Sequence, residues 1–250
     1  MKFLLLGTGG WISPPHLDFI SILVEVSNKL ILIDPSEYCV RRIQRLGIDL
    51  EKIDLVLVTH SHGDHALGFP TLVIWLSHLN VRKKVRVLAL ESVIEDLRLL
   101  LRATRIEKHE NKVVEYVPIA MSNVRDPCVV YRDDVCEIRA ILTRHTVECL
   151  AFRITELSSG KSITYTGDTA PCEEIVKLAQ GTDVLICETS CLSEEARMFG
   201  HSCTKDAVEL AKKAGAKLLV PVHYYVTGDI VISDCGVPIL VPIVNHWYVV

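Results

Sequence analysis

Two patterns of apolar residues alternate along the chain. Short runs rich in isoleucine, leucine and valine have the length of buried strands, and longer stretches repeat their apolar residues at helical spacing. The predicted strands are residues 3–6, 21–25, 30–33, 54–59, 85–88, 137–142, 150–154, 162–166, 184–187 and 218–222. The predicted helices are residues 39–46, 91–104, 172–180 and 204–214. Strands and helices interleaved in this way predict an α/β protein whose sheets are covered by helices.

The alternation of strands and helices continues along the whole chain without a sign of a domain boundary. No low-complexity segment, internal repeat or linker rich in proline and serine divides the 250 residues, so we expect a single domain over 1–250. A chain of this length can bury a sizeable core. The first apolar run ends at Gly7, which is too short for a signal sequence, and no apolar stretch is long enough to cross a bilayer. We therefore expect a cytoplasmic protein without membrane contacts.

Charge and cysteine usage exclude several kinds of site. The net charge of -4 gives no general electrostatic reason to bind nucleic acid. Nine scattered cysteines without a Cys-x-x-Cys pair argue against a zinc ribbon, although a disulfide remains open. Arg98, Arg102 and Arg105 recur at helical spacing, but carboxylates lie between them, which favours a solvated helix face over a phosphate-binding patch. The segment 7–10 lacks the glycine spacing of a dinucleotide fingerprint, so no such cofactor is expected.

Candidate chemistry gathers after the predicted strands, above all in the run Thr59–His65. His60, His62, Asp64 and His65 place four potential metal ligands within six residues. Imidazole nitrogens and carboxylate oxygens suit zinc, iron or manganese. A solvated polar loop is the alternative interpretation, which the density of ligands disfavours. Asp168 and His223 likewise follow predicted strands, where residues of functional sites are often positioned.

The same run resembles the His-x-His-x-Asp-His signature of the metallo-β-lactamase superfamily. Further segments resemble the ribonuclease Z branch of that superfamily and occur in its order: 3–9, 31–34, 68–70, 144–146 with 152–153, 165–169, 199–202 and 220–223. The resemblance implies the αβ/βα four-layer sandwich, with two facing sheets and helices outside. The alternation of strands and helices agrees with this fold but does not specify it.

The resemblance also implies two divalent metal ions, with zinc expected and manganese or iron as alternatives. One ion would be bound by His60, His62 and His145, the other by Asp64, His65 and His223, and Asp168 would bridge them. A hydroxide held between two such ions is a nucleophile at neutral pH, because the metals lower the pKa of bound water.

Two residues are expected to have catalytic roles beyond binding metal. Asp64 would orient the hydroxide. His201 matches a histidine that lies near the scissile phosphate in ribonuclease Z-like enzymes, where it can protonate the leaving oxygen. The alternative is that His201 is structural, since Ser202–Thr204 could cap the helix that follows.

The chain departs from that branch in its means of holding a large RNA. The interval between His145 and Asp168 has room only for two strands joined by a short turn at 158–161, and not for the arm that grips transfer RNA. The branch's serine after the last histidine is absent, and Leu17-Asp18 replaces its Arg-Asn pair. The arginine stripe offers no clear substitute for the arm. Nucleic acid is therefore a weakly supported partner.

We accordingly predict a metal-dependent hydrolase, most simply a phosphodiesterase acting on a small phosphodiester and forming a homodimer. Three alternatives stay open. One is a lactonase or thioesterase of the glyoxalase II kind, for which His201 has no evident use. Another is a true transfer-RNA 3′-processing endonuclease, and the third is a metal-binding protein without turnover.

Overall fold

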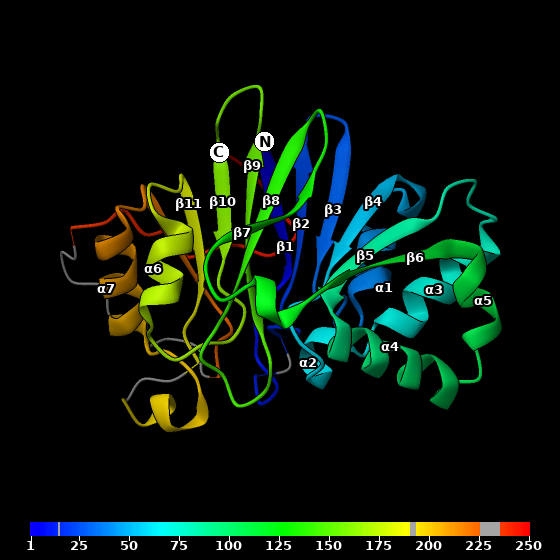
Figure 1. The fold of residues 1–250 in the computed structure, drawn as a ribbon, viewed down its shortest axis with the longest axis horizontal. Helices are drawn as coiled ribbons and strands as arrows, with labels where there is room; N and C mark the ends of the chain where they lie inside the picture. The colour runs from blue at the N-terminus through cyan, green and yellow to red at the C-terminus, as the bar shows by residue number, and fades with distance from the viewer. Residues whose placement is uncertain (15, 191–193, 226–235) are drawn as a thin grey trace.

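Two β-sheets face each other and helices cover their outer faces in the computed structural model (Figure 1). The structure describes residues 1–14, 16–190, 194–225 and 236–250. Strand order in the seven-stranded sheet is β13-β1-β2-β3-β4-β5-β6, and in the six-stranded sheet β12-β11-β10-β9-β8-β7. This arrangement confirms the predicted α/β class and the four-layer sandwich.

The bounds of the strands are as follows. The first sheet contains β1 (Lys2–Gly7), β2 (Ser21–Val26), β3 (Lys29–Ile33), β4 (Ile53–Leu57), β5 (Val85–Leu90), β6 (Val114–Ile119) and β13 (Trp247–Val249). The second contains β7 (Cys128–Arg132), β8 (Cys136–Leu142), β9 (Leu150–Glu156), β10 (Ser162–Tyr165), β11 (Val184–Glu188) and β12 (Leu218–Val222). Neighbours are parallel from β3 to β6 and from β10 to β12.

The helices cover the two sheets separately (Figure 1). Those beside the first sheet are α1 (Cys39–Arg45), α3 (Phe69–His78), α4 (Glu91–Ala103) and α5 (Glu107–Val113), and those beside the second are α6 (Glu173–Ala179) and α7 (Thr204–Ala214). Short elements complete the described part: α2 (Gly63–Ala66) and the 3-10 turns η1 (Leu50–Lys52), η2 (Met121–Asn123) and η3 (Glu194–Phe199). In α4, Val93, Leu97 and Leu101 recur at helical spacing and are buried, so this face packs inward.

The main core lies between the sheets and joins both of them. Side chains such as Leu32 and Val56 from the first sheet belong to one buried cluster with Phe152 and Ile186 from the second. Burial of this apolar surface is the main stabilising contribution to the fold. A smaller cluster lies under α6 and α7 on the outer face of the second sheet.

The predicted strands and helices are found near their expected positions, but the prediction missed several elements. It left out α2, α3 and α5 and the strands β6, β7 and β13. In α3 apolar residues are spread around most of the helix, so its sequence gives little helical periodicity. β7 and β13 are edge strands with half-buried side chains, which lack the continuous apolar run of a central strand.

Two further expectations concern cysteines and membranes. The seven cysteines within the described ranges are free thiols, and most of them are buried. Cys191 and Cys235 lie outside these ranges. Within the described part of the chain, no helix is both long enough and apolar enough to cross a membrane.

Candidate metal centre

The predicted ligands meet at one edge of the sandwich, where loops from both sheets converge. His60 follows β4, and His62, Asp64 and His65 lie at the start of or within α2. The second sheet contributes His145 from the β8–β9 loop, Asp168 after β10, His201 before α7 and His223 after β12. The structure thus brings together every residue that the sequence analysis proposed for the site.

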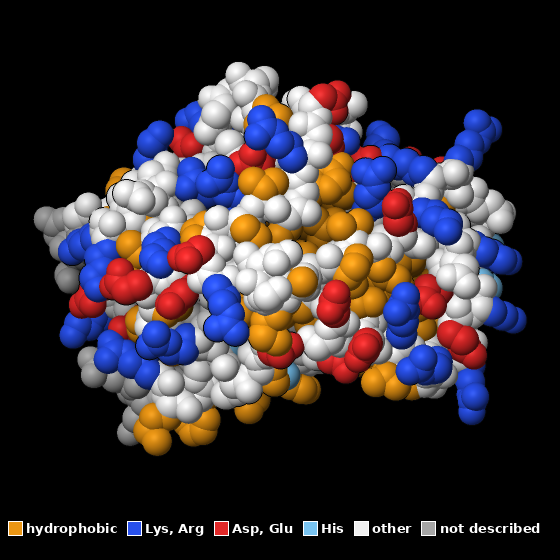
Figure 2. Space-filling model, in the orientation of Figure 1, with side chains coloured by type: hydrophobic (Ala, Val, Ile, Leu, Met, Phe, Trp, Pro, Cys, Tyr) orange, Lys and Arg blue, Asp and Glu red, His pale blue; other side chains and the backbone are white. Residues whose placement is uncertain are grey.

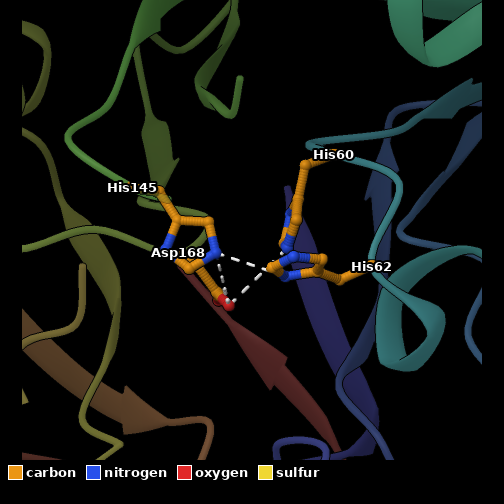
Figure 3. A group of neighbouring side chains, drawn as sticks. All are labelled: His60, His62, His145 and Asp168. Carbon is orange, nitrogen blue, oxygen red and sulfur yellow. Dashed lines mark hydrogen bonds and ion pairs between the residues drawn. The ribbon is translucent and has the colours of Figure 1, made fainter. Parts of the chain in front are cut away.

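The first group consists of His60, His62, His145 and Asp168, whose side chains point toward one another (Figure 3). One ligand atom from each lies within 4.8 Å of the others. His145 Nε2 is 3.3 Å from His62 Nδ1, and Asp168 Oδ2 is 3.7 Å from His60 Nε2 and 3.8 Å from His145 Nε2. Nitrogen and oxygen atoms at these separations can surround one cation.

The second group, Asp64, His65 and His223, lies on the other side of Asp168. His223 Nε2 is 3.1 Å from Asp64 Oδ2 and 3.3 Å from His65 Nε2. Asp168 Oδ1 is 3.5 Å from His65 Nε2 and 3.4 Å from His223 Nε2. The two oxygens of Asp168 therefore face different groups, which is the geometry that a bridging carboxylate requires.

Hydrogen bonds around the site fix which nitrogen of each ring carries a proton. His145 Nδ1 donates to the Gly200 carbonyl at 2.9 Å, and His65 Nδ1 donates to Asp34 at 2.8 Å. Thr59 Oγ1 donates to Asp34, so the 3.0 Å contact between Thr59 Oγ1 and His60 requires His60 Nδ1 to be the donor. In the neutral form of each of these rings, which is the form that binds a metal, Nε2 carries a lone pair directed into the site.

The same reasoning applies to His223. Ser190 Oγ donates to Glu188 at 2.7 Å, so His223 Nδ1 must donate to Ser190 Oγ, also at 2.7 Å. Nε2 of His223 then faces a carboxylate oxygen of Asp64 and Nε2 of His65. These contacts need a positive charge between the atoms, which either a proton or a bound cation supplies.

Unpaired atoms inside the site point to the same requirement. Among the described residues, His60 Nε2 and Asp168 Oδ1 are buried without a hydrogen-bond partner. Buried polar atoms are rarely left unsatisfied, because desolvation is not compensated. The residues present therefore fit divalent metal ions, which the fold family implies.

The electrostatic field of the site explains how its groups titrate. Burial opposes a charge on His65, yet Asp168, Asp64 and Asp34 together hold its pKa well above the ordinary value. Burial, reinforced by the charge of His65, holds the pKa of His60 well below that value. Burial also opposes the charge on Asp168, but His223 and His65 hold its pKa well below the usual range. The carboxylates thus favour a positive charge at His65, whereas burial keeps His60 neutral.

His201 lies beside both groups and rests on a fully buried carboxylate. Its Nδ1 is 3.0 Å from Glu188 Oε1 and 3.9 Å from Asp168 Oδ2. Burial lowers the pKa of His201, but the hydrogen bond and charge of Glu188 outweigh it and the pKa is raised. Glu188 also accepts from the backbone N–H groups of Thr169 and Ser202, at 2.8 and 3.1 Å, which fixes its position.

Sequence analysis missed two supporting carboxylates, Asp34 and Glu188. Both are fully buried, and both lie at the end of a strand in which the preceding residues are buried. An acidic residue directly after an apolar run was the available signal, since an unpaired carboxylate is costly to bury. The arginine stripe lies at an exposed surface, where Arg98 pairs with Glu110 and lies over Tyr116.

Comparison with known proteins identifies the class. Residues 29–224 match the family model described as the beta-lactamase superfamily domain. A ribonuclease Z from Aeropyrum pernix is 27% identical over 270 residues, covering 88% of this chain and 86% of the relative. The short form of human tRNase Z superposes with a TM-score of 0.78 at 22% identity, covering 90% of this chain and 92% of that chain. A diphosphatase of the PhnP family superposes with a TM-score of 0.76 at 19% identity, covering 100% and 97%.

Fold and site together define a metal-dependent hydrolase built on two facing sheets. The chain belongs to the beta-lactamase superfamily domain family, and the predicted resemblance to ribonuclease Z is confirmed.

Proposed function

We propose that the protein is a phosphodiesterase that uses two divalent metal ions. Zinc is the proposed metal, and manganese and iron are the alternatives. The observation that carries the proposal is the pairing of two ligand groups across Asp168 with a histidine, His201, that has its own buried carboxylate. Metal ligands alone would serve many hydrolytic reactions of the superfamily. A separate, positioned acid is of most use where the leaving group is a poor one, as in an alkyl phosphodiester.

The proposed ligand assignment follows the geometry of the two groups. His60, His62 and His145 would hold one ion, and Asp64, His65 and His223 the other, with one oxygen of Asp168 on each. Bound there, two divalent ions would lower the pKa of water and offset charge on the phosphoryl oxygens. We further assign to Asp64 the orientation of the attacking water, because its carboxylate lies beside His223 within the second group.

His201 would protonate the departing oxygen. Its Nδ1 is held by Glu188, which leaves Nε2 as the nitrogen able to donate to substrate. Glu188 acts as a positioning residue that fixes the ring and favours its protonated form. A carbon-centre hydrolase, such as a lactonase or thioesterase, would gain little from this pair, because its leaving group needs less assistance.

We propose small phosphodiesters as substrates in preference to a transfer-RNA precursor. β9 and β10 are joined by a tight turn, in which Gly160 N donates to Glu156 O at 2.9 Å, so no arm lies between them. The alignment with the Aeropyrum pernix ribonuclease Z spans 270 positions, more than the 250 residues of this chain, so that relative has residues without a counterpart here. On the face in Figure 2, basic and acidic side chains are interspersed, which is unlike a continuous phosphate-binding surface.

The domain organisation and the oligomeric state are also part of the proposal. We propose one domain over residues 1–250, supported by a main core that includes side chains of both sheets. A homodimer is proposed from the resemblance alone, and light scattering of the purified protein would test it.

The proposed function is tested by a substrate panel. Metal-loaded protein should hydrolyse bis(p-nitrophenyl) phosphate and nucleoside phosphodiesters with kcat/KM well above that for lactones and thioesters, and should cleave a precursor transfer RNA poorly at physiological salt. Preferential hydrolysis of a thioester or lactone would replace the proposal by the carbon-centre reaction. Rapid cleavage of the precursor on the 3′ side of its acceptor stem would identify a true processing enzyme, and no turnover on any substrate would indicate a binding protein.

A further inference from the structure

A cavity lies next to the metal centre, and one of its lining side chains contacts a proposed metal ligand. This pocket, of about 290 Å³, is lined by Trp11, Ser13, Pro14, Asp18, Phe19, Glu37 and Tyr38. Trp11 also contacts a proposed metal ligand, since its ring centroid is 5.6 Å from that of His62. A ligand whose phosphate lies on the metals could therefore extend past Trp11 into the pocket.

The two outer aromatic residues of the pocket are exposed, although large aromatic side chains are usually buried. Trp11 is 52% exposed and Tyr38 is 59% exposed. Tyr38 is also held at φ 66, in the left-handed region, where a bulky side chain is strained. Such strain is retained most often at binding sites, where it fixes a side chain in a useful orientation. Tyr38 is therefore an exposed and strained aromatic residue at the pocket, where a bound ligand can contact it.

Charge restricts what the pocket can accept. The charged side chains lining it are the carboxylates Asp18 and Glu37, and its described lining includes no lysine or arginine. Asp18 is paired with Arg42, whereas Glu37 is half-buried at the pocket wall. A phosphate would be repelled here, so the occupant must be neutral or cationic and can donate hydrogen bonds to a carboxylate.

We propose that this pocket binds the nucleobase of a nucleoside phosphodiester, and this inference rests on the proposed phosphodiesterase function. A nucleobase combines the required properties: two flat faces that stack on Trp11 and Tyr38, no charge, and N–H groups for Glu37. The volume lies near the lower end of the range for small-molecule sites, about 300 Å³, so it accommodates one nucleobase and not a folded RNA. The substrate class is accordingly a single nucleoside joined to phosphate.

The test compares two esters with the same leaving group, thymidine 5′-p-nitrophenyl phosphate and methyl p-nitrophenyl phosphate. We expect kcat/KM of the wild type to favour the thymidine ester. In Trp11→Ala the ratio of the two values should fall by about 5- to 150-fold, the range that loss of a base–aromatic stack produces. Trp75→Ala is the matched control, since Trp75 lines a different cavity, beside His78 and His109, and the ratio should be retained.

Tyr38→Gly separates a binding role from a structural one. Glycine adopts a positive φ without strain, so the melting temperature should be retained or raised while the ratio falls. A fall in both melting temperature and activity, with the ratio unchanged, would assign Tyr38 a purely structural role and contradict the proposal.

A binding measurement distinguishes failure of this inference from failure of the proposed function. Thymidine 5′-monophosphate should quench tryptophan fluorescence of the metal-loaded protein, and the quenching should disappear in Trp11→Phe. Quenching without hydrolysis of either ester would refute the phosphodiesterase proposal and leave the nucleobase pocket standing. Hydrolysis of both esters at equal kcat/KM without quenching would overturn the nucleobase pocket and leave the phosphodiesterase standing.

Discussion

The two halves of the metal centre are built in different ways. The first sheet contributes its ligands from one continuous loop and short helix, residues 60–65. The second sheet contributes His145, Asp168, His201 and His223 from loops far apart in the sequence. In the first half, local backbone geometry positions the ligands, and Asp34 accepts a hydrogen bond from His65. The second half depends on the relative positions of β8 to β12 and on Glu188, so its geometry depends on the tertiary fold of the whole sheet.

The largest effect is expected where the halves meet. Asp168→Ala removes the only carboxylate that faces both ligand groups among the described residues, and should lower kcat/KM on bis(p-nitrophenyl) phosphate by more than about 10³-fold. Asp126→Ala, at an exposed carboxylate paired with Lys177, is the matched control and should retain activity. Activity of Asp168→Ala within tenfold of wild type would show that the halves work without a bridge.

The half of the site contributed by the second sheet should also determine how strongly the rate depends on the leaving group. His201→Ala should lower kcat on alkyl phosphodiesters by about 10²–10⁴-fold while retaining the metals, because general acid catalysis is lost. The loss should be much smaller on p-nitrophenyl esters, whose leaving group needs no proton. Glu188→Gln should show the same dependence of the rate loss on the leaving group, but with a smaller loss. His246→Ala, which changes an exposed histidine, is the control and should show no loss. An equal loss on both kinds of ester would indicate phosphate binding or structural damage instead.

Metal binding by the half of the site at residues 60–65 should depend on Asp34, the carboxylate that supports it. Asp34→Asn weakens the acceptor for His65 Nδ1 and Thr59 Oγ1, which orient two of the ligand rings. Metal affinity, measured by competition with a chelator, should fall by about 10–100-fold. Lower thermal stability with unchanged metal affinity would mean that Asp34 supports the loop and not the ligands.

The smallest effect is expected at a residue remote from the metals that holds the strands of the second sheet in their relative positions. Asp183, before β11, accepts from Ser162 N at 2.9 Å and Lys217 Nζ at 2.9 Å and so ties together the starts of β10, β11 and β12. Asp183→Asn should lower the free energy of unfolding by about 1–2 kcal/mol at neutral pH. Little of this loss should come from the ion pairs with the lysines, because the lysine side chains are exposed.

The pH dependence of this effect has a defined sign. Burial raises the pKa of Asp183, but Lys217, Ser162 N and Lys161 outweigh it, so the folded-state pKa lies below the ordinary value. The stabilisation is therefore present above the unfolded pKa of about 3.9 and is lost as pH falls through the folded pKa. Urea denaturation should show the difference between wild type and variant shrinking below about pH 4. A constant difference across pH would exclude the charge as its cause.

The contrast between the halves also explains what the sequence could predict. His60, His62, Asp64 and His65 could be recognised from spacing alone, because one turn brings them together. Asp168 and His223 could be singled out because they follow predicted strands, but His145, and the assignment of all three to the metals, came from resemblance to a family, since nothing local links residues on separate strands. Glu188 was missed because its role arises only when β11 places it under His201. Edge strands such as β7 were missed for a related reason: their burial depends on the neighbouring strand.

The most direct test of the account is the metal content of the protein. Elemental analysis of metal-replete wild type should give about two transition-metal ions per chain, because ligands of both halves converge on Asp168. Asp168→Ala should bind one ion or fewer under the same conditions. One ion or fewer in the wild type, or two ions retained in Asp168→Ala, would contradict a site assembled by bridging the two halves.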